Sequence, residues 1–186
     1  MCIRDRYSNG QTKDIPGLWD KVAAATKDVV KRQADLGIDV LSDGEYGKAS
    51  YAGYVKERLT GFEGETRPPM RGMREQDDFP DWVRTTAPRV TYPTNNGPVT
   101  LRDKAAVRRD VANLRAAIQG VKSEGVFMTA ASPGVIENFM PSEYYKNDED
   151  YLLALAEAMR DEYQAVVGAG FTLQLDCPDL AMSRHT

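Results

Sequence analysis

The sequence contains few of the residues that build metal sites and nucleophilic sites. Its 186 residues include two cysteines, Cys2 and Cys177, and one histidine, His185. The cysteines stand at opposite ends of the chain, so neither a disulfide framework nor a paired-cysteine metal site is encoded. The single histidine excludes a histidine-based triad or a two-histidine metal site within this chain. We therefore assign no metal ligand among these residues.

Excess positive charge and long apolar runs are also absent. The formal net charge is -4, whereas nucleic-acid binding relies on clustered Lys and Arg. We therefore expect small-molecule partners and no nucleic acid. No apolar run approaches the roughly 20 residues that a membrane helix requires, and the N-terminus lacks the apolar core of a signal peptide. These absences predict no membrane partner and a cytoplasmic location.

Both ends of the chain have the features of an incomplete sequence. Residues 1–6 read MCIRDR, which resembles a translated sequencing adaptor, and we leave them out of the fold interpretation. The other end stops at Arg184-His185-Thr186, just after a predicted strand and without a closing helix or polar tail. We interpret residues 7–186 as part of one catalytic domain.

Predicted helices and strands alternate along most of the chain. The spacing of apolar residues predicts helices at 18–37, through 107–121 and at about 148–167, and strands at 38–42, 125–132 and 171–176. Between residues 60 and 98 the pattern gives way to Gly, Pro, Arg and Asp, which is typical of a substrate-binding lid or a disordered segment. A hairpin is predicted at 89–101, around Asn96-Gly97.

This alternation indicates a parallel sheet with helical connections. The sequence has no Gly-x-Gly-x-x-Gly motif and no phosphate-binding Gly-Lys-Ser/Thr loop, so a doubly wound nucleotide fold lacks its main signature. The predicted fold class is an α/β (β/α)8 TIM barrel that is incomplete, comprising its N-terminal and middle part.

Polar residues follow the predicted strands, where the active site of such a barrel lies. The three strand ends are Asp43-Gly44-Glu45, Ser132-Pro133-Gly134 and Asp176-Cys177-Pro178-Asp179. Along the last strand Asp176 shares the parity of Thr172 and Gln174, which predicts that it faces the barrel interior. Asp43 and Glu45 share a face if the first strand stays extended, although Gly44 permits a bend.

These residues are open to several interpretations. Two converging carboxylates can bind a substrate ammonium group, hold a metal, or act as acid and base. Strand-end acids also cap helices or pair with basic residues. Cys177 could be a nucleophile or a metal ligand, but a lone cysteine at a strand end is more often buried and inert. The aromatic residues near the first acidic site could form a ring-stacking wall for a flat cofactor, although ordinary packing explains most of them: Tyr46, Tyr51, Tyr54, Phe62, Trp82 and Tyr92.

Three segments resemble those of the cobalamin-independent methionine synthases. Residues 33–45, QADLGIDVLSDGE, are similar to that family's Gly-hydrophobic-Asp-x-x-x-x-Gly-Glu segment. Residues 173–180, LQLDCPDL, are similar to its Gln-hydrophobic-Asp-Glu-Pro-x-Leu segment, with Cys177 where the family has Glu. Residues 131–136, ASPGVI, stand where the family carries a Thr-Gly-Pro-hydrophobic-Thr turn. The short, single-barrel branch of the family is the most similar.

The resemblance implies a zinc-dependent transfer of a methyl group from 5-methyltetrahydrofolate to the thiol of homocysteine, in methionine biosynthesis. By position, it implies that Glu45 and Asp176 hold the amino group of homocysteine. Asp43, Ser132 and Cys177 are candidate pocket-lining residues, and no residue is assigned to the chemical step. The family's zinc ligands would fall beyond residue 186, so this chain alone is expected to be inactive.

Three alternatives remain open at this point. Relatives of the short branch include enzymes that open epoxides with the thiol of coenzyme M, so the alkyl donor and the thiol are both undecided. A uroporphyrinogen-decarboxylase-like barrel shares the architecture and requires no zinc. A non-catalytic chain that binds a small ligand, or none, is the alternative from a different functional class.

Overall fold

The computed structural model describes residues 16–67, 77–85 and 91–182, and its centre is a parallel sheet. Its three strands lie in the order β1 (Val40–Ser42), β4 (Gly125–Ala131) and β5 (Thr172–Asp176). Helix α6 (Lys104–Ala117) leads into β4, and helix α8 (Asp148–Gly168) leads into β5. The predicted parallel α/β arrangement is confirmed. Three strands do not close a barrel, so the eight-stranded barrel stays a prediction.

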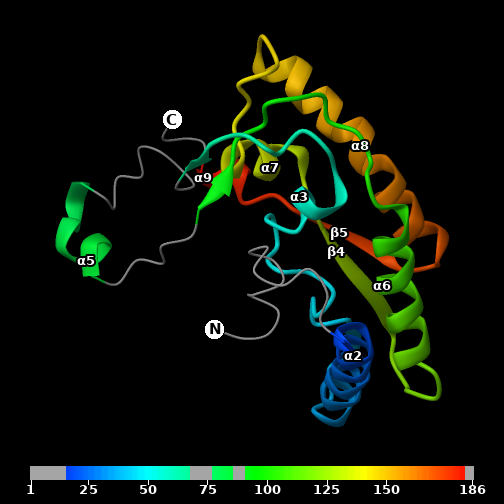
Figure 1. The fold of residues 1–186 in the computed structure, drawn as a ribbon. Coiled ribbons are helices and arrows are strands. Elements are labelled where there is room, and N and C mark those ends of the chain that lie inside the picture. The colour runs from blue at the N-terminus through cyan, green and yellow to red at the C-terminus, as the bar shows by residue number, and fades with distance from the viewer. Residues whose placement is uncertain (1–15, 68–76, 86–90, 183–186) are drawn as a thin grey trace.

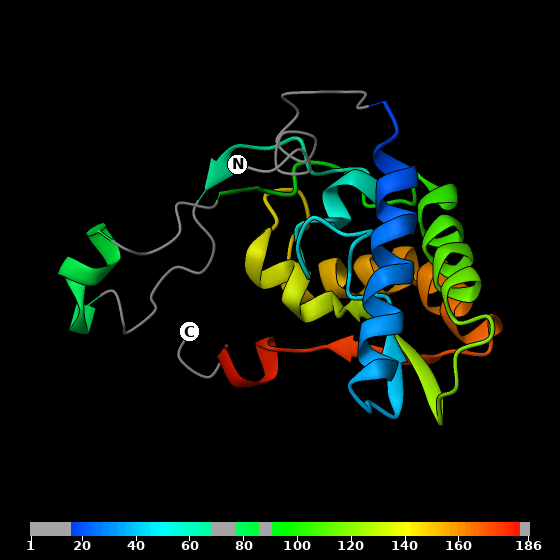
Figure 2. The ribbon, with the colours of Figure 1, turned by 90° about the horizontal axis from the view of Figure 1, so that it is seen from below.

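A layer of helices packs against one face of this sheet. Helix α2 (Leu18–Asp35) contacts α6, and α6 contacts α8, so that the three lie side by side (Figures 1 and 2). Strand period two turns Leu41 and Met128 toward the helices. There they join a buried cluster that also contains Val30, Val107, Val111, Leu114, Ala117, Val166 and Phe171.

A second core lies beyond the carboxyl ends of the strands. It is formed by helix α3 (Val55–Arg58), helix α7 (Pro133–Phe139), the first half of α8 and the loops between them. A small antiparallel pair, β2 (Thr66–Arg67) with β3 (Tyr92–Pro93), borders this region. Helix α9 (Asp179–Met182) follows β5, and helix α5 (Pro80–Thr85) lies apart from the other elements in both views (Figures 1 and 2).

The predicted helices occur with small shifts at their ends. Helix α2 ends two residues before Gly37, whose φ of 79° suits glycine. Helix α6 begins at Lys104, earlier than the apolar pattern suggests, because the Asp103 side chain caps it by accepting from the Ala105 and Ala106 amides. The predicted cap of α8 is confirmed, since the Asn147 side chain accepts from the Asp150 amide. None of the helices in the described ranges has the length and apolar character needed to cross a bilayer.

The hairpin predicted around Asn96-Gly97 is wrong. Strand β3 pairs with β2, and Leu101 forms a bridge with Leu59, so this segment pairs with the earlier one and not with itself. The buried Asn95 side chain explains the difference, because its Nδ2 donates to Gly61 O at 2.8 Å and to Gly97 O at 2.7 Å. Asn95, a residue type that is common in turns, thus makes tertiary contacts here. Residues 1–6, residues 89–90 of the predicted hairpin, and His185 lie outside the described residues.

Candidate functional site

The turn after β1 bends back on itself, and the strand does not continue. The Gln33 side chain holds the last strand residue, since Ser42 N donates to Gln33 Oε1 at 2.9 Å and Gln33 Nε2 donates to Ser42 O at 3.0 Å. Gly44 and Glu45 then adopt φ angles of 64° and 59°. A left-handed backbone costs a non-glycine residue roughly 1–2 kcal/mol, and such strain concentrates at functional sites. The extended strand that would put Asp43 and Glu45 on one face is therefore not formed.

Asp43 lies inside this turn. The residue is 4% exposed, and its Oδ1 accepts from the Glu45 amide at 3.0 Å. This contact is the local side-chain turn that aspartate commonly makes with the backbone two residues on. The Asp43 side chain therefore stabilises the turn that contains Glu45.

The Glu45 side chain reaches across to β4. Glu45 Oε1 accepts from Thr129 Oγ1 at 2.5 Å. Lys48 Nζ donates to Thr129 Oγ1 at 3.3 Å and also to the Thr129 carbonyl. Both Lys48 and Thr129 are buried. The sequence reasoning missed them; a polar residue within the apolar strand 125–131 was a signal for Thr129, but nothing in the sequence distinguished Lys48.

Asp176 occupies the corresponding position at the end of β5. Its Oδ1 accepts from Gln174 Nε2 at 3.0 Å, and its carbonyl accepts from the Ser132 amide at 3.1 Å. Gln174 is the register partner of Thr129, and neighbouring strands lie about 4.8 Å apart. Glu45 and Asp176 therefore lie at the same carboxyl edge of the sheet on either side of β4, each tied to one member of this pair.

Ser132 and Cys177 lie at this edge with different surroundings. Ser132 Oγ accepts from the Val135 amide at 3.1 Å, which caps α7, and donates to Asp179 Oδ1 at 2.9 Å. A Cβ on Gly134 would lie 2.3 Å from Asp179 Oδ2, so the turn 132–134 closely fits that carboxylate. Cys177 is a partly buried free thiol. The helix start at Ser132-Pro133 was readable from sequence, because Ser at the cap and Pro at the first helical position favour one.

A buried ion network lies next to this edge. Arg58 donates to Glu162 Oε2 at 2.9 Å and to Asp110 Oδ2 at 2.5 Å, and Tyr54 Oη donates to Glu162 Oε1 at 2.6 Å. Burial raises the pKa of Asp110, while the Arg58 guanidinium acts to lower it. Lys48 Nζ lies 4.9 Å from the centroid of the Tyr54 ring, which links the network to Thr129 and Glu45.

Half of the six aromatic residues near the site are core residues, whereas Tyr46, Tyr51 and Trp82 are exposed. Tyr54, Phe62 and Tyr92 belong to the buried cluster beyond the strand ends, as the packing interpretation predicts. Tyr51 is 38% exposed and packs edge-on against Phe139, with 5.5 Å between ring centroids. Burial raises the pKa of Tyr51, and the charges of Tyr92 and Asp176 raise it further.

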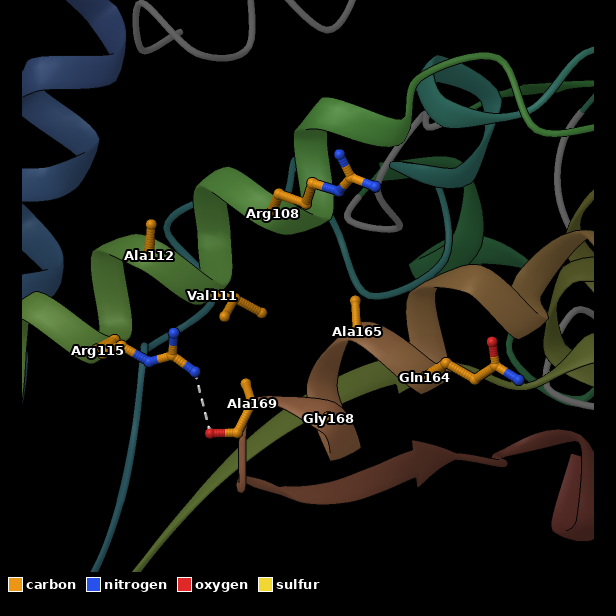
Figure 3. Close-up of a pocket in the computed structure, with 8 residues that line it drawn as sticks. All are labelled: Arg108, Val111, Ala112, Arg115, Gln164, Ala165, Gly168 and Ala169. Atoms are coloured by element: carbon orange, nitrogen blue, oxygen red, sulfur yellow. Dashed lines mark hydrogen bonds between the residues drawn. The ribbon is translucent and has the colours of Figure 1, made fainter.

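A groove on the helical layer lies away from this edge. It has a volume of about 370 Å³ between α6 and α8 (Figure 3), and its lining residues are Arg108, Val111, Ala112, Arg115, Gln164, Ala165, Gly168 and Ala169. Arg115 Nη2 donates to Ala169 O at 3.2 Å. Since Ala169 ends α8 just before β5 begins, the groove lies at the opposite end of β5 from Asp176.

The described residues do not fit a zinc ion. No group of three His, Cys, Asp or Glu side chains within residues 16–67, 77–85 and 91–182 could hold a metal. Cys177, the one cysteine in these ranges, has no such partners. The site in this part of the chain consists of the Glu45 and Asp176 carboxylates. They are supported by the Thr129 hydroxyl, the Gln174 amide and the Lys48 ammonium group.

Comparisons with known proteins give a likeness to a solved structure. No family model matches the chain, and no curated protein matches it. Its structure is similar to that of a B12-independent methionine synthase from Shewanella sp. W3-18-1 in complex with selenomethionine, with a TM-score of 0.70 and 21% sequence identity. The match covers 89% of this chain and 44% of that one, so the chain spans less than half the length of the synthase. At this identity the likeness shows the fold: the chain folds like part of a B12-independent methionine synthase.

Proposed function

We propose that the chain is the substrate-holding part of a (β/α)8 barrel methyltransferase, which moves a methyl group from 5-methyltetrahydrofolate to the thiol of homocysteine. The fold likeness to a B12-independent methionine synthase supports this proposal. The three segments that resemble the family give independent support, because residues 33–45, 131–136 and 173–180 all run into or leave the carboxyl edge of the same sheet.

The observation that carries the proposal is the placement of Glu45 and Asp176. Both carboxylates lie at one edge, and each is oriented by a hydrogen bond from the Thr129–Gln174 pair. An ammonium group has three donors and no acceptor, so it suits a site of two carboxylates. At 4 Å and an effective dielectric constant of 20, each charge pair gains about 4 kcal/mol before the cost of desolvation.

The same carboxylates favour homocysteine over coenzyme M as the thiol. Homocysteine carries an ammonium group, which the pair attracts, beside its carboxylate, whereas coenzyme M carries a sulfonate and no cation for the pair to bind. A sulfonate favours a site of net positive charge, whereas among the described residues of this site the two acids Glu45 and Asp176 outnumber the one cation, Lys48. We therefore take the amino-acid thiol as the substrate class.

None of the described residues is proposed as a zinc ligand. Since the described part of the chain offers no set of ligands, we assign it no metal and derive no step through zinc. The zinc ligands would belong to residues beyond position 186. This chain's contribution is to bind and orient the amino-acid end of the thiol substrate.

Calorimetric titration of the chain with L-methionine and L-homocysteine tests the binding role. Glu45→Gln and Asp176→Asn each remove one charge-assisted contact while preserving shape, and each should raise Kd about tenfold or more. Glu157→Gln is the matched control, because that side chain is exposed on α8 and paired with Arg160. Its Kd should equal that of the wild type.

A des-amino ligand, 4-(methylsulfanyl)butanoate, supplies the second arm of this experiment. It should bind more weakly than L-methionine to the wild type, and Glu45→Gln should not weaken it further. Unchanged L-methionine binding in both carboxylate variants would refute the proposed site. Methyl transfer to homocysteine, compared with coenzyme M alkylation by epoxides, should be assayed in the protein that contains this chain together with its zinc ligands.

A further inference from the structure

Lys48 and Thr129 connect the candidate site to the buried ion network. We propose that these two residues position Glu45, holding its carboxylate as a hydrogen-bond acceptor aimed at the ammonium group of an amino-acid ligand. The inference rests on the proposed function, because it assumes that Glu45 binds this group. It assigns tasks to two residues that touch Glu45 and not the ligand.

The direction of the hydrogen bonds follows from the available donors. A lysine ammonium group has three hydrogens and no acceptor, and a threonine hydroxyl has one hydrogen and two lone pairs. Lys48 Nζ donates to Thr129 Oγ1 at 3.3 Å, so the hydroxyl hydrogen cannot point back at Lys48. It is directed at Glu45 Oε1, 2.5 Å away. Lys48 thereby occupies a lone pair of the Thr129 hydroxyl and leaves its hydrogen for Glu45.

Lys48 is itself firmly held. It is 5% exposed, donates to the Thr129 carbonyl, and lies over the Tyr54 ring at 4.9 Å. Its backbone is also tied to the same turn, since Lys48 N donates to Glu45 O at 2.9 Å. Glu45 is therefore fixed at its carbonyl by the Lys48 amide and at its carboxylate by Thr129.

This arrangement has a consequence for binding. A long glutamate side chain usually loses rotamer freedom when it takes up a ligand, and a side chain that is already ordered loses less. The left-handed backbone of Glu45, at φ 59°, is a second sign that its orientation is imposed by the surroundings. Removing the hydroxyl of Thr129 should weaken ammonium binding without altering the shape of the edge.

Three variants test the inference by titration with L-methionine and with 4-(methylsulfanyl)butanoate. Thr129→Val keeps the side-chain shape and should raise the Kd of L-methionine about tenfold, with no change for the des-amino ligand. Thr129→Ser keeps the hydroxyl and should stay within about threefold of the wild type. Circular dichroism and urea unfolding establish that each variant is folded.

The direction in which Lys48→Met changes the Kd of L-methionine distinguishes two roles for Lys48. If Lys48 acted only as a nearby positive charge, its removal would relieve repulsion and tighten L-methionine binding. The positioning role predicts weaker binding, by about threefold or more. Tighter binding in Lys48→Met, or equal losses for both ligands in Thr129→Val, would overturn the inference.

The outcomes also separate this inference from the proposed function. If Glu45→Gln weakens L-methionine binding and Thr129→Val does not, the positioning role fails while the site stands. If Glu45→Gln has no effect, the proposed ammonium site fails, and the positioning role falls with it. Weakened binding in Glu45→Gln and Thr129→Val, with recovery in Thr129→Ser, supports both.

Discussion

Replacing Arg58 by Met should remove a large part of the stability of the described fold. The Arg58 side chain is 6% exposed and sits between the carboxylates of Asp110 and Glu162, which are 2% and 7% exposed. Removing the guanidinium leaves two buried carboxylates without a counter-ion. Breaking a buried pair in this way typically lowers the free energy of unfolding by about 3–5 kcal/mol. Domains of this kind have an unfolding free energy of about 5–15 kcal/mol, so the loss is large on that scale.

Arg160→Met is the matched control. Arg160 pairs with Glu157 on the surface of α8, with side chains that are 60% and 68% exposed. Exposed pairs three residues apart on a helix contribute about 0.5 kcal/mol or less. Urea unfolding followed by far-UV circular dichroism at pH 7 compares the two variants with the wild type, provided that the slope with denaturant is unchanged.

The pH dependence checks the cause of the loss. The pKa of Asp110 in the folded protein is raised by burial and opposed by Arg58. An acid with a raised pKa in the folded state contributes stability that is present at low pH and is lost as pH rises through that pKa. In Arg58→Met the opposing charge is gone, so the pKa of Asp110 rises further, and the deficit should be largest at pH 7 and shrink toward pH of about 4.

Two results would contradict this reasoning. One is an equal loss in Arg58→Met and Arg160→Met, which would mean that burial does not matter. The other is a deficit that is the same at acidic and neutral pH, which would point to lost packing and not to uncompensated charge. Adding Asp110→Asn and Glu162→Gln to Arg58→Met should restore part of the stability at pH 7, because no buried carboxylate then remains without its cation.

Two further predictions concern glycine and a second acid. Gly47→Ala should lower the free energy of unfolding by about 1–3 kcal/mol, because the added Cβ would lie 2.2 Å from Asp110 Oδ1. Gly168→Ala, whose Cβ would meet nothing within 4 Å, should raise it by about 0.5–1 kcal/mol in the same urea assay. Similar effects at both sites would refute the steric argument. Burial raises the pKa of Glu137, and Asp148 and Asp179 raise it further, so the wild type loses stability as pH rises through this pKa. Glu137→Gln should therefore be more stable than the wild type at pH 7, and this difference in stability should vanish below about pH 4. Thermal unfolding curves recorded over a pH series measure it. A difference that persists at low pH would be inconsistent with titration of Glu137.

The helices and parallel strands were readable from the sequence because the signals for them are local. Apolar spacing over 18–35 and 148–168, with Asn147 as a cap, reports which face of a helix is buried, whatever it packs against. The strand-end positions of Glu45 and Asp176 followed from the same patterns, since a strand's carboxyl end is set by where its apolar run stops. The parity of Asp176 with Gln174 was also local, and these two side chains do contact each other.

Other features depended on contacts between distant parts of the chain. The residue that orients Glu45 is Thr129, 84 positions away, and Lys48 reaches the same residue from 81 positions away. Arg58 meets Glu162 across 104 positions. No local pattern encodes such pairs, because their partners are selected only when strands and helices pack.

The same distinction explains the mistaken hairpin and the site turn. Asn96-Gly97 has the local chemistry of a tight turn, but hydrogen bonds from Asn95 to Gly61 and pairing of β3 with β2 determine the path of the chain. The sequence by itself determined that carboxylates stand at the ends of two parallel strands. Only the tertiary structure decided that Glu45 takes a left-handed backbone and is held by Thr129, because that strained conformation is stable only when packed neighbours impose it.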